Sequence, residues 1–437
     1  MNNFLEKIGI KGNLKKNFGI IILLAFGVAI ISGLPFFRFE YYDVYLTTYN
    51  LTNTQMGVFG SIIGFFGIIS YLFGGVIADG LNVKNIIVVS LLATGISGLI
   101  HLLPIGFYGL IIIYAIWGIS TTFAFWPACV KAIRVMSDRT NQGKAYGFFE
   151  GGRNIAGGII ALVALILFRI GVSGMDNKVL AMKYVILFYS SVNIIMAVFA
   201  YYFIKDDKMV MASGSVNFCG VSKLLRNPAI WIICLLSFCN HVFCLSVYYY
   251  IPYTTQILGA SVAFGATLGV LRRFGSIGGN ITGGYLTDKI GTGKLMLWAY
   301  IIIFLLQIIL LLVPVNPLFV PVVAILYVLI LVFFNMNYAM SWTMISQSNI
   351  PLEYSGTAAG LISTVGSIPE MFVSISAGNI IDKNPGITGY KYIFYILTAI
   401  IGIESILIYV WIKHLKRKEK NCKIDESTKE DIKVCMH

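Results

Sequence analysis

Residues 284–294 read GYLTDKIGTGK, a glycine, an acid and two lysines held between two long apolar runs. Residues 75–84 read GVIADGLNVK and repeat the glycine, the acid four residues later and a lysine beyond it. The two acids, Asp79 and Asp288, are separated by about half of the 437-residue chain. A charged turn that recurs at this spacing between apolar segments predicts a membrane protein whose two halves arose by duplication.

The composition is that of a protein inside a lipid bilayer. Hydrophobic residues make up 58% of the chain and charged residues only 12%, with a mean hydropathy of +0.83. A soluble globular chain is about 25% charged. The seven cysteines show no CxxC spacing and no clustering with histidine, so that neither a zinc site nor a disulfide framework is expected. No cofactor is expected either.

Apolar runs of about 20 residues, the length that a helix needs to cross the hydrocarbon core, recur along the chain. They predict twelve transmembrane helices, at 18–37, 55–78, 86–103, 107–132, 145–168, 183–204, 228–257, 263–286, 295–313, 319–345, 355–381 and 392–412. The only sizeable polar connection between runs spans 205–227. We therefore expect one six-helix half at 18–204 and a second at 228–412.

Lysine and arginine indicate the orientation. Most of the 32 basic residues fall before residue 18, in alternate connections, in 205–227 and after residue 412, which places both termini in the cytoplasm. Attraction of these flanks to anionic lipid accounts for the net charge of +13, so that no nucleic-acid partner is expected. We expect a multi-pass plasma or inner membrane protein with a cytoplasmic N-terminal segment at 1–17, a cytoplasmic loop at 205–227 and a disordered cytoplasmic tail at 413–437.

Twelve helices in two halves, with the glycine–acid–base turn after the second helix of each half, resemble the major facilitator superfamily. The second turn matches that family's motif as G-x-x-x-D-K-x-G-x-x-K, whereas the first has Gly80 in place of a base and Asn82 in place of a glycine. The resemblance implies an all-α fold with two pseudo-symmetric halves and a motif that ties helices together on the cytoplasmic side in one conformational state. A simple tight turn is the alternative. The residues assigned to this gating motif are Gly75, Asp79, Lys84, Gly284, Asp288, Lys289 and Lys294.

Within the superfamily the chain looks most similar to organophosphate:phosphate antiporters and anion:cation symporters. Arg38 resembles their substrate-facing arginine in the first helix, and residues 126–131 (WPACVK) resemble their W-P-P-C-x-R segment, which makes Lys131 a candidate substrate residue. Residues 153–158 (RNIAGG) resemble a run that begins with histidine in those families. Arg153 replaces that histidine, and the helix at 228–257 contains no arginine. Both departures argue against inorganic phosphate exchange.

Arginines at bilayer depth supply the independent argument from the residues. A charge at that depth costs roughly 2.5–3.5 kcal/mol unless a partner, water or ligand compensates it. Arg38 follows Gly33-Leu34-Pro35, where proline predicts a kink toward the space between the halves. Because guanidinium forks bind phosphate, sulfonate or carboxylate oxygens in pairs, we predict that Arg38, Arg153 and Arg272 form an anion site there.

Each of these arginines has a structural alternative. Arg38 could pair with Glu40 or Asp43 at the outer surface, and Glu150, three residues from Arg153, could neutralise that side chain on the same helical face.

Arg272 and Arg273 are neighbours about 100° apart on a helix, so that only one of them can face the space between the halves. We choose Arg272 and expect Arg273 to pair with an acid, for which Glu370 is a candidate.

Polar side chains near these arginines extend the predicted site. Tyrosines gather at 41–45 and 248–250, and amides occur in the tenth predicted helix. We predict that Tyr42, Tyr249 and Asn337 bind hydroxyl groups of a sugar- or glycerol-like solute, with core packing as the alternative for each.

Acids in apolar surroundings are the candidates for proton coupling, because desolvation favours the neutral carboxyl whereas a nearby arginine favours the ionised one. Glu370 and Glu150 are the coupling candidates, with a structural arginine pair as the alternative for Glu370. Glu404, in the last span, is expected to be structural. His241 is expected to be a packing residue.

These patterns predict a secondary transporter, not an enzyme, that moves a small organic anion by alternating access through anion exchange or proton symport. The glycine strings at 147–152 and 275–279 follow no strand and precede no suitably placed lysine, so that we interpret them as helix-packing surfaces rather than phosphate loops. Two alternatives stay open: a proton-coupled carrier of a neutral polar or lipophilic solute, and a transporter-like sensor that signals through its tail. A monomer is expected.

Overall fold

The computed structural model describes residues 12–80, 82–136, 142–175, 177–204, 224–341, 344, 347–348 and 355–434. These residues are helical almost throughout, because an α-helix satisfies its own backbone hydrogen bonds where lipid offers none. The N-terminal half contains α2 (Gly12–Ile31), α3 (Gly33–Glu40), α4 (Tyr42–Tyr49), α5 (Asn53–Gly80), α6 (Val83–Ile100), α7 (Phe107–Trp117), the π-helix η1 (Gly118–Phe125), α8 (Trp126–Met136), α9 (Gln142–Met175) and α10 (Lys178–Phe203).

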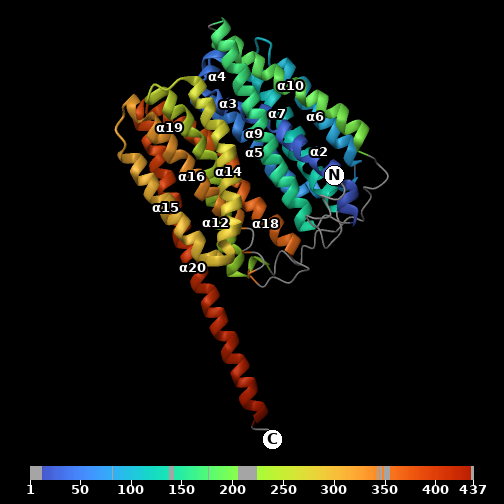
Figure 1. The fold of residues 1–437 in the computed structure, drawn as a ribbon, viewed down its shortest axis with the longest axis vertical. Helices are drawn as coiled ribbons and strands as arrows, with labels where there is room; N and C mark the ends of the chain where they lie inside the picture. Colours follow the sequence, from blue (N-terminus) through green and yellow to red (C-terminus); the bar gives the residue numbers. More distant parts are fainter. Residues whose placement is uncertain are drawn as a thin grey trace.

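The C-terminal half, also drawn in Figure 1, begins with α12 and ends with the long helix α20. It contains α12 (Pro228–Ser246), η4 (Val247–Tyr249), α13 (Tyr250–Pro252), η5 (Tyr253–Ile257), α14 (Val262–Ile290), α15 (Thr292–Leu312), η6 (Pro317–Phe319), α16 (Val320–Ser341), α18 (Ser355–Ser367), η8 (Ile368–Met371), α19 (Val373–Lys383) and α20 (Ile387–Val434).

Twelve spans follow from these helices. Ten helices of the described chain are long and apolar enough to cross a membrane, and the bent pair α2 and α3 makes an eleventh span. The remaining span is α14, a 29-residue helix that is less apolar because it carries Arg272, Arg273 and Asn280. At 1.5 Å per residue α14 is about 44 Å long, more than the roughly 30 Å of a hydrocarbon core. The predicted twelve-helix fold is confirmed.

Two breaks, each near a proline, interrupt the spans, and the first is the kink predicted at Pro35. The axes of α2 and α3 differ by 47°, and the bend immediately precedes Pro35, which has no N–H to donate into the preceding turn. Pro369 lies in η8, which separates α18 from α19. Arg38 lies on α3 after the first break, and Glu370 lies in η8, at the second.

The two halves meet along a row of glycines on α5, namely Gly57, Gly60, Gly64 and Gly67, which we call the glycine seam. A Cβ atom on Gly57 would lie 2.4 Å from the carbonyl oxygen of Ser374, and one on Gly64 would lie 2.4 Å from the carbonyl carbon of Glu370. Because of this close approach, α5 packs directly on η8 and α19.

Hydrogen bonds close the outer ends of the halves above the glycine seam. The carboxylate of Asp382 on α19 accepts from the backbone N–H groups of Asn53 and Thr54 and from both of their side chains, at 2.6–3.1 Å. Gln256 Nε2 donates to Asp43 Oδ1 at 2.6 Å, again across the halves. Burial raises the pKa of the Asp43 carboxyl, although hydrogen bonds from Thr255 and Gln256 act in the opposite direction. These contacts hold the outer ends of the two halves together.

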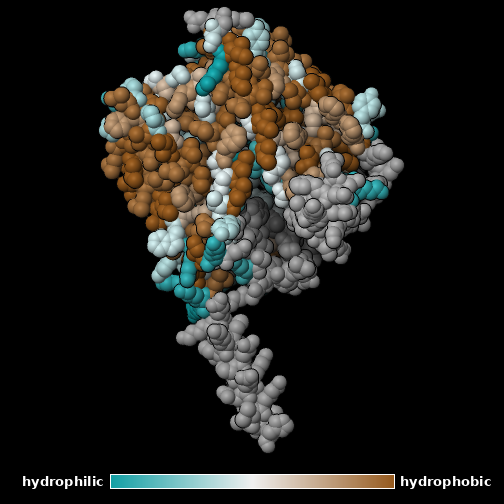
Figure 2. All heavy atoms as spheres, viewed as in Figure 1, coloured by the Kyte–Doolittle hydropathy of each residue, from teal (hydrophilic) through white to brown (hydrophobic). Residues whose placement is uncertain are grey.

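The surface fits a bilayer around this bundle. Figure 2 shows hydrophobic residues over the middle of the visible face and hydrophilic residues gathered at its lower end, near the point where α20 leaves the bundle. Exposed apolar side chains such as Ile112, Ile170 and Trp298 would contact lipid. The structure differs from the expectation of a disordered tail at 413–437, because α20 continues as a helix to Val434 and projects beyond the other helices (Figure 1).

Candidate functional site

The first arginine of the candidate site, Arg38, lies on α3 just after the bend. It is 1% exposed, and its Nη1 donates to the carbonyl oxygen of Pro35. Its guanidinium carbon lies 4.4 Å from the ring centre of Phe39 and 5.1 Å from that of Tyr114, while its Nε has no hydrogen-bond partner. Among the described residues no carboxylate lies within ion-pair distance of Arg38, so that the alternative pairing with Glu40 or Asp43 is not seen.

Two aromatic rings connect Arg38 to Arg272. The ring centres of Phe39 and Tyr248 are 4.4 Å apart, with 21° between the ring planes, and the guanidinium carbon of Arg272 lies 4.3 Å from the centre of the Tyr248 ring. Arg38, Phe39, Tyr248 and Arg272 thus contact one another in succession, and we call them the arginine–aromatic stack. It joins α3 of one half to η4 and α14 of the other. Each charge gains a cation–π contact in place of the water it has lost.

Arg273, the neighbour of Arg272, pairs with an acid from the other half. Its Nη2 lies 3.9 Å from Glu40 Oε1, and both side chains are mostly buried. The acid that pairs with Arg273 is therefore Glu40 on α3. The sequence had led us to expect Glu370 instead. Gly269 makes room for this approach, because a Cβ there would lie 2.7 Å from Glu40 Cγ. Within the described residues Arg272 has no carboxylate at ion-pair distance.

Arg153 lies on α9 and pairs with the acid one turn before it. Its Nη2 donates to Glu150 Oε2, and its guanidinium carbon lies 5.7 Å from the centre of the Trp126 ring on α8. The side chains of Arg153 and Glu150 are 37% and 41% exposed. The alternative stated for Arg153, a pair with Glu150 on the same helix, is thus the arrangement found. A solute would have to compete with Glu150 for this guanidinium.

Glu370 lies at the inner part of the glycine seam, beside a histidine. Oε1 of Glu370 is 3.9 Å from His241 Nε2, and a Cβ on Gly67 would lie 3.3 Å from the other carboxyl oxygen. His241 Nδ1 is 2.9 Å from the carbonyl oxygen of Ser237, a contact in which only a protonated Nδ1 can donate. The remaining Nε2 then faces Glu370. His241 is therefore more than the packing residue expected from the sequence.

The other residues predicted to bind the solute lie outside the arginine–aromatic stack. Tyr42 donates to Asn53 Oδ1 at 2.8 Å within the N-terminal half, and Tyr249 donates to the carbonyl oxygen of Ser374 at 3.0 Å within the C-terminal half. Asn337 is fully buried in α16, and neither atom of its amide group has a hydrogen-bond partner. Lys131 is half-buried on α8.

The gating motif is described only in part. The side chains of Asp79 and Asp288, and the surroundings of Gly75 and Gly284, lie outside the described part of the structure. Gly291 ends α14 with a φ of +84°, a conformation that favours glycine at this motif position. The ammonium groups of two motif lysines stack on tyrosines, Lys84 on Tyr201 at 4.5 Å and Lys289 on Tyr285 at 4.4 Å, and Lys294 is exposed.

A buried histidine that the sequence reasoning missed lies behind Arg38. His101, at the end of α6, contacts the hydroxyls of Tyr45 at 2.8 Å and Tyr49 at 2.9 Å through its two ring nitrogens. Tyr114 joins this group to Arg38, because its hydroxyl donates to Tyr45 at 3.3 Å. The available signal was a histidine at the end of an apolar run together with two tyrosines four residues apart. Among the described residues no three His, Cys, Asp or Glu side chains gather as a metal site would require.

Comparisons with known proteins identify the family and the fold. The family model described as Major Facilitator Superfamily matches residues 18–374. Two inner membrane proteins of Escherichia coli (strain K12) are similar along almost the whole chain. YihN is 26% identical over 418 residues, covering 93% of this chain and 98% of its own. YqcE is 23% identical over 409 residues, covering 91% and 95%.

Solved transporter structures share the fold. The nucleoside transporter NupG superposes with a TM-score of 0.68 at 12% identity, covering 90% of this chain and 98% of that chain. A bacterial homologue of the human lysosomal transporter Spinster, in an inward-facing and occupied conformation, gives a TM-score of 0.65 at 14% identity, covering 92% and 97%. At these identities the likeness concerns the fold alone. With a family model that matches most of its length, the chain belongs to the Major Facilitator Superfamily, whose fold implies secondary transport by alternating access.

Proposed function

We propose that the protein moves a small organic anion, one with a phosphate, sulfonate or carboxylate group, across the inner membrane. The observation that carries this proposal is a difference among four arginines. Arg153 and Arg273 each have an acid within ion-pair distance, whereas Arg38 and Arg272 have none among the described residues. A buried charge without a counter-ion is costly, so that a ligand supplying the missing negative charge would account for keeping both.

The local balance of charge supports an anionic solute. Around α3 and α14, the guanidinium groups of Arg38, Arg272 and Arg273 accompany one described carboxylate, that of Glu40. An excess of positive charge between apolar walls raises the local concentration of anions. Guanidinium also binds two oxygens of one anionic group at once, which selects phosphate, sulfonate and carboxylate over neutral polar groups.

The arginine–aromatic stack supports a link between binding and alternation. Phe39 belongs to the N-terminal half and Tyr248 to the C-terminal half, so that their rings separate whenever the outer ends of the halves move apart. An anion bound to Arg38 and Arg272 would replace ring contacts with charge-assisted hydrogen bonds. Its affinity would then differ between the two states, and only such a difference lets a ligand shift a conformational equilibrium.

Binding assays on purified protein test the anion site. We expect phosphorylated, sulfonated or carboxylated solutes to raise the apparent melting temperature, because a ligand of the folded state stabilises it. Arg38→Lys and Arg272→Lys keep the charge but lose the planar fork, and each should weaken anion binding by at least tenfold, or about 1.4 kcal/mol. The control is the double variant Glu40→Gln/Arg273→Gln, which removes the neighbouring ion pair without changing net charge. Anion binding unchanged in both lysine variants would contradict the proposed site.

Coupling is proposed to involve Glu370 and His241, with anion exchange as the alternative to proton symport. Both groups lie where α12 meets η8, close to the glycine seam, so that they are well placed to respond when α5 moves. Glu150 is the second candidate, and it is paired with Arg153.

Transport assays with Glu370→Gln test the coupling role. In proteoliposomes with an imposed pH gradient, we expect this variant to lose accumulation of solute while it retains counterflow, because glutamine keeps the shape of the carboxyl but carries no exchangeable acid proton. Glu150→Gln serves as the comparison. Accumulation unchanged in Glu370→Gln would exclude it from coupling. Uptake of neutral solutes alone would favour the neutral-solute carrier, and binding without flux would favour the sensor.

A further inference from the structure

A carboxyl group lies in the interior of the C-terminal half with no partner. Glu404, on α20, is 0% exposed, and neither of its carboxyl oxygens has a hydrogen-bond partner. Its helix packs against α12 and α15 along most of the membrane depth, with α19 and η5 beside it. The site of Glu404 is separate from the arginine–aromatic stack, which involves α3, η4 and α14.

The groups that face Glu404 are neutral. Cys239 on α12 and Tyr300 on α15 are the titratable side chains close to it. On the two remaining neighbours, Asp382 and Lys383 lie at the outer end of α19, and Tyr253 of η5 contacts the outer part of α20 at Tyr390 and Phe394. No arginine, lysine or histidine of the described residues lies within ion-pair distance of Glu404. An ionised carboxylate here would bear its whole desolvation cost, several kcal/mol, without compensation.

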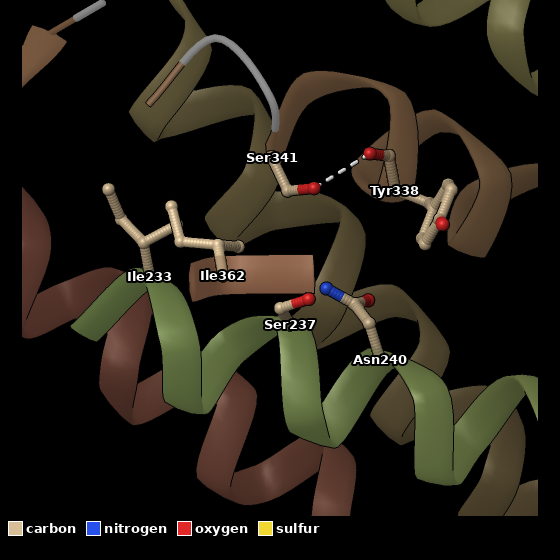
Figure 3. Close-up of a pocket in the computed structure, with 6 residues that line it drawn as sticks. All are labelled: Ile233, Ser237, Asn240, Tyr338, Ser341 and Ile362. Atoms are coloured by element: carbon tan, nitrogen blue, oxygen red, sulfur yellow. Dashed lines mark hydrogen bonds between the residues drawn. The ribbon is translucent and has the colours of Figure 1, made fainter. Parts of the chain in front are cut away.

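Tyr300, one of the two titratable neighbours of Glu404, makes a hydrogen bond to α12. The hydroxyl of Tyr300 donates to Asn240 Oδ1 at 3.2 Å, and Asn240 Nδ2 has no partner although its residue is fully buried. Figure 3 shows that amide nitrogen directed toward Ser237, into a small pocket. The pocket is lined by Ile233, Ser237, Asn240, Tyr338, Ser341 and Ile362, and it has room for about one water molecule.

Ser237, which lines this pocket, also contacts the histidine beside Glu370. Ser237 accepts from His241 Nδ1 through its carbonyl oxygen, and His241 Nε2 is 3.9 Å from Glu370. Residues two apart on a helix are about 200° apart, so that Cys239 faces Glu404 on one side of α12 and His241 faces Glu370 on the other. Helix α12 therefore stands between the buried carboxyl group of Glu404 and the partly exposed one of Glu370, with the amide of Asn240 at the pocket.

We propose that Glu404 is a second proton-binding site, which holds a proton at neutral pH and exchanges it, through Tyr300 and a water molecule in the pocket beside Asn240, with His241 on the Glu370 side of α12. The O–H bond of the Glu404 carboxyl breaks as an O–H bond forms on the Tyr300 oxygen, the original O–H bond of Tyr300 breaks as its proton passes to the water molecule, and the water passes a proton to His241 Nε2. Asn240 is a positioning residue, because its amide orients the hydroxyl of Tyr300 and lines the pocket. The proposal extends the proton coupling proposed above and does not depend on the solute being an anion.

Infrared spectroscopy of the lipid-embedded protein tests the protonation state without any solute. We expect the absorption of protonated carboxyl groups at neutral pH to be weaker in Glu404→Gln than in the unmodified protein. Glutamine resembles the protonated carboxyl in shape and charge, so that the fold should persist. The control is Glu150→Gln, which removes a carboxylate that is ion-paired with Arg153. A band that is unchanged in Glu404→Gln would overturn the proposal.

Hydrogen–deuterium exchange of the same band tests the route. Tyr300→Phe removes the hydroxyl but keeps the ring, and we expect the Glu404 carboxyl to exchange about tenfold more slowly in this variant. Tyr409→Phe, at a lipid-facing tyrosine on α20, is the matched control. Equal exchange rates in Tyr300→Phe and the unmodified protein would overturn the route. If proteoliposome assays show a neutral solute instead of an anion, these spectroscopic results still decide the role of Glu404.

Discussion

Four arginines of similar depth reach different environments, and the difference lies in which helix supplies the nearest side chain. Arg153 has an acid one turn away on its own helix, and Arg273 meets Glu40 because the bend before α3 turns that segment toward α14. Arg38 and Arg272 meet aromatic rings instead. A cation–π contact compensates a desolvated guanidinium by about 2 kcal/mol, less than a well-placed anion supplies, so that both side chains stay receptive to a negatively charged ligand.

Substitution of Tyr248 separates the role of the ring from the role of the hydroxyl. We expect Tyr248→Phe to bind and transport the solute like the unmodified protein, because the stack uses the ring face. Tyr248→Leu should weaken the outer closure and destabilise the protein by about 2 kcal/mol, since it loses the contacts with Phe39 and Arg272. Thermal unfolding and solute binding measure the two effects. A strong loss of binding in Tyr248→Phe would mean that the hydroxyl itself binds the solute.

At this scale the sequence predicts contacts within one helix and misses contacts between distant ones. The Arg153–Glu150 pair follows from a spacing of three residues. The choice of Glu370 as the acid for Arg273 was wrong, because Glu40 lies more than 200 positions away in sequence and reaches Arg273 only through the bend before α3. The contact between His241 and Glu370, and the contact of Asp382 with the start of α5, could not be predicted from the sequence for the same reason.

Among the elements, α5 and α19 determine how closely the halves can approach. The glycine seam removes side chains from one face of α5, so that Ser374 and Glu370 lie directly on its backbone. Small residues at helix interfaces are a general means of close packing in membranes, where burial of apolar surface gives little driving force. A surface without side chains also lets one helix move along another with few obstacles.

Gly57→Ala tests the glycine seam. The added methyl group would lie 2.4 Å from Ser374 O and 2.5 Å from Ile375 Cα, both backbone atoms that cannot move aside independently. We expect overpacking of about 1–3 kcal/mol in the closed state, and hence a shift toward states in which the outer ends separate. Spin labels at Thr47 and Leu318 report the distance between the outer ends. The control Gly19→Ala, where nothing lies within 4 Å, should leave the distance unchanged. An unchanged spin-label distance in Gly57→Ala would mean that α5 and α19 accommodate the added methyl group without separation of the outer ends.

The elements themselves are the part of the structure that the sequence predicts best. Hydrophobic length gives the spans, and Pro35 and Pro369 mark the two breaks, because a missing N–H disturbs a helix wherever it occurs. The span predicted at 263–286 corresponds to α14, although its arginines lower its apolar character. The sequence predicts a disordered tail at 413–437, whereas α20 continues as a helix to Val434.

For the whole molecule, alternation requires that the outer closure be strong enough to hold and weak enough to open. The described polar contacts across the outer ends are the hydrogen bonds of the Asp382 carboxylate at the start of α5, the Asp43–Gln256 and Arg169–Thr267 hydrogen bonds, and the Glu40–Arg273 ion pair deeper in. Gln256 also accepts from Tyr390 at 2.7 Å, which ties the closure to α20. Polar contacts near water suit a reversible closure, because water can replace each partner as the halves separate.

Asp382 is the point where one substitution should change the balance between states. Its carboxylate accepts four hydrogen bonds from Asn53 and Thr54 and lies at the N-terminus of α5, where the helix dipole favours a negative charge. Because the site is exposed to solvent, we assign it only about 1 kcal/mol, so that Asp382→Ala should change the ratio of closed to open outer ends by roughly fivefold. Spin labels at Thr47 and Leu318 would show the added long-distance population. Asn177→Ala, which removes a helix cap within one half, should lower stability by about 1 kcal/mol without changing that distance. If both variants gave the same distance distribution, Asp382 would be a helix cap only and the closure would depend on the glycine seam.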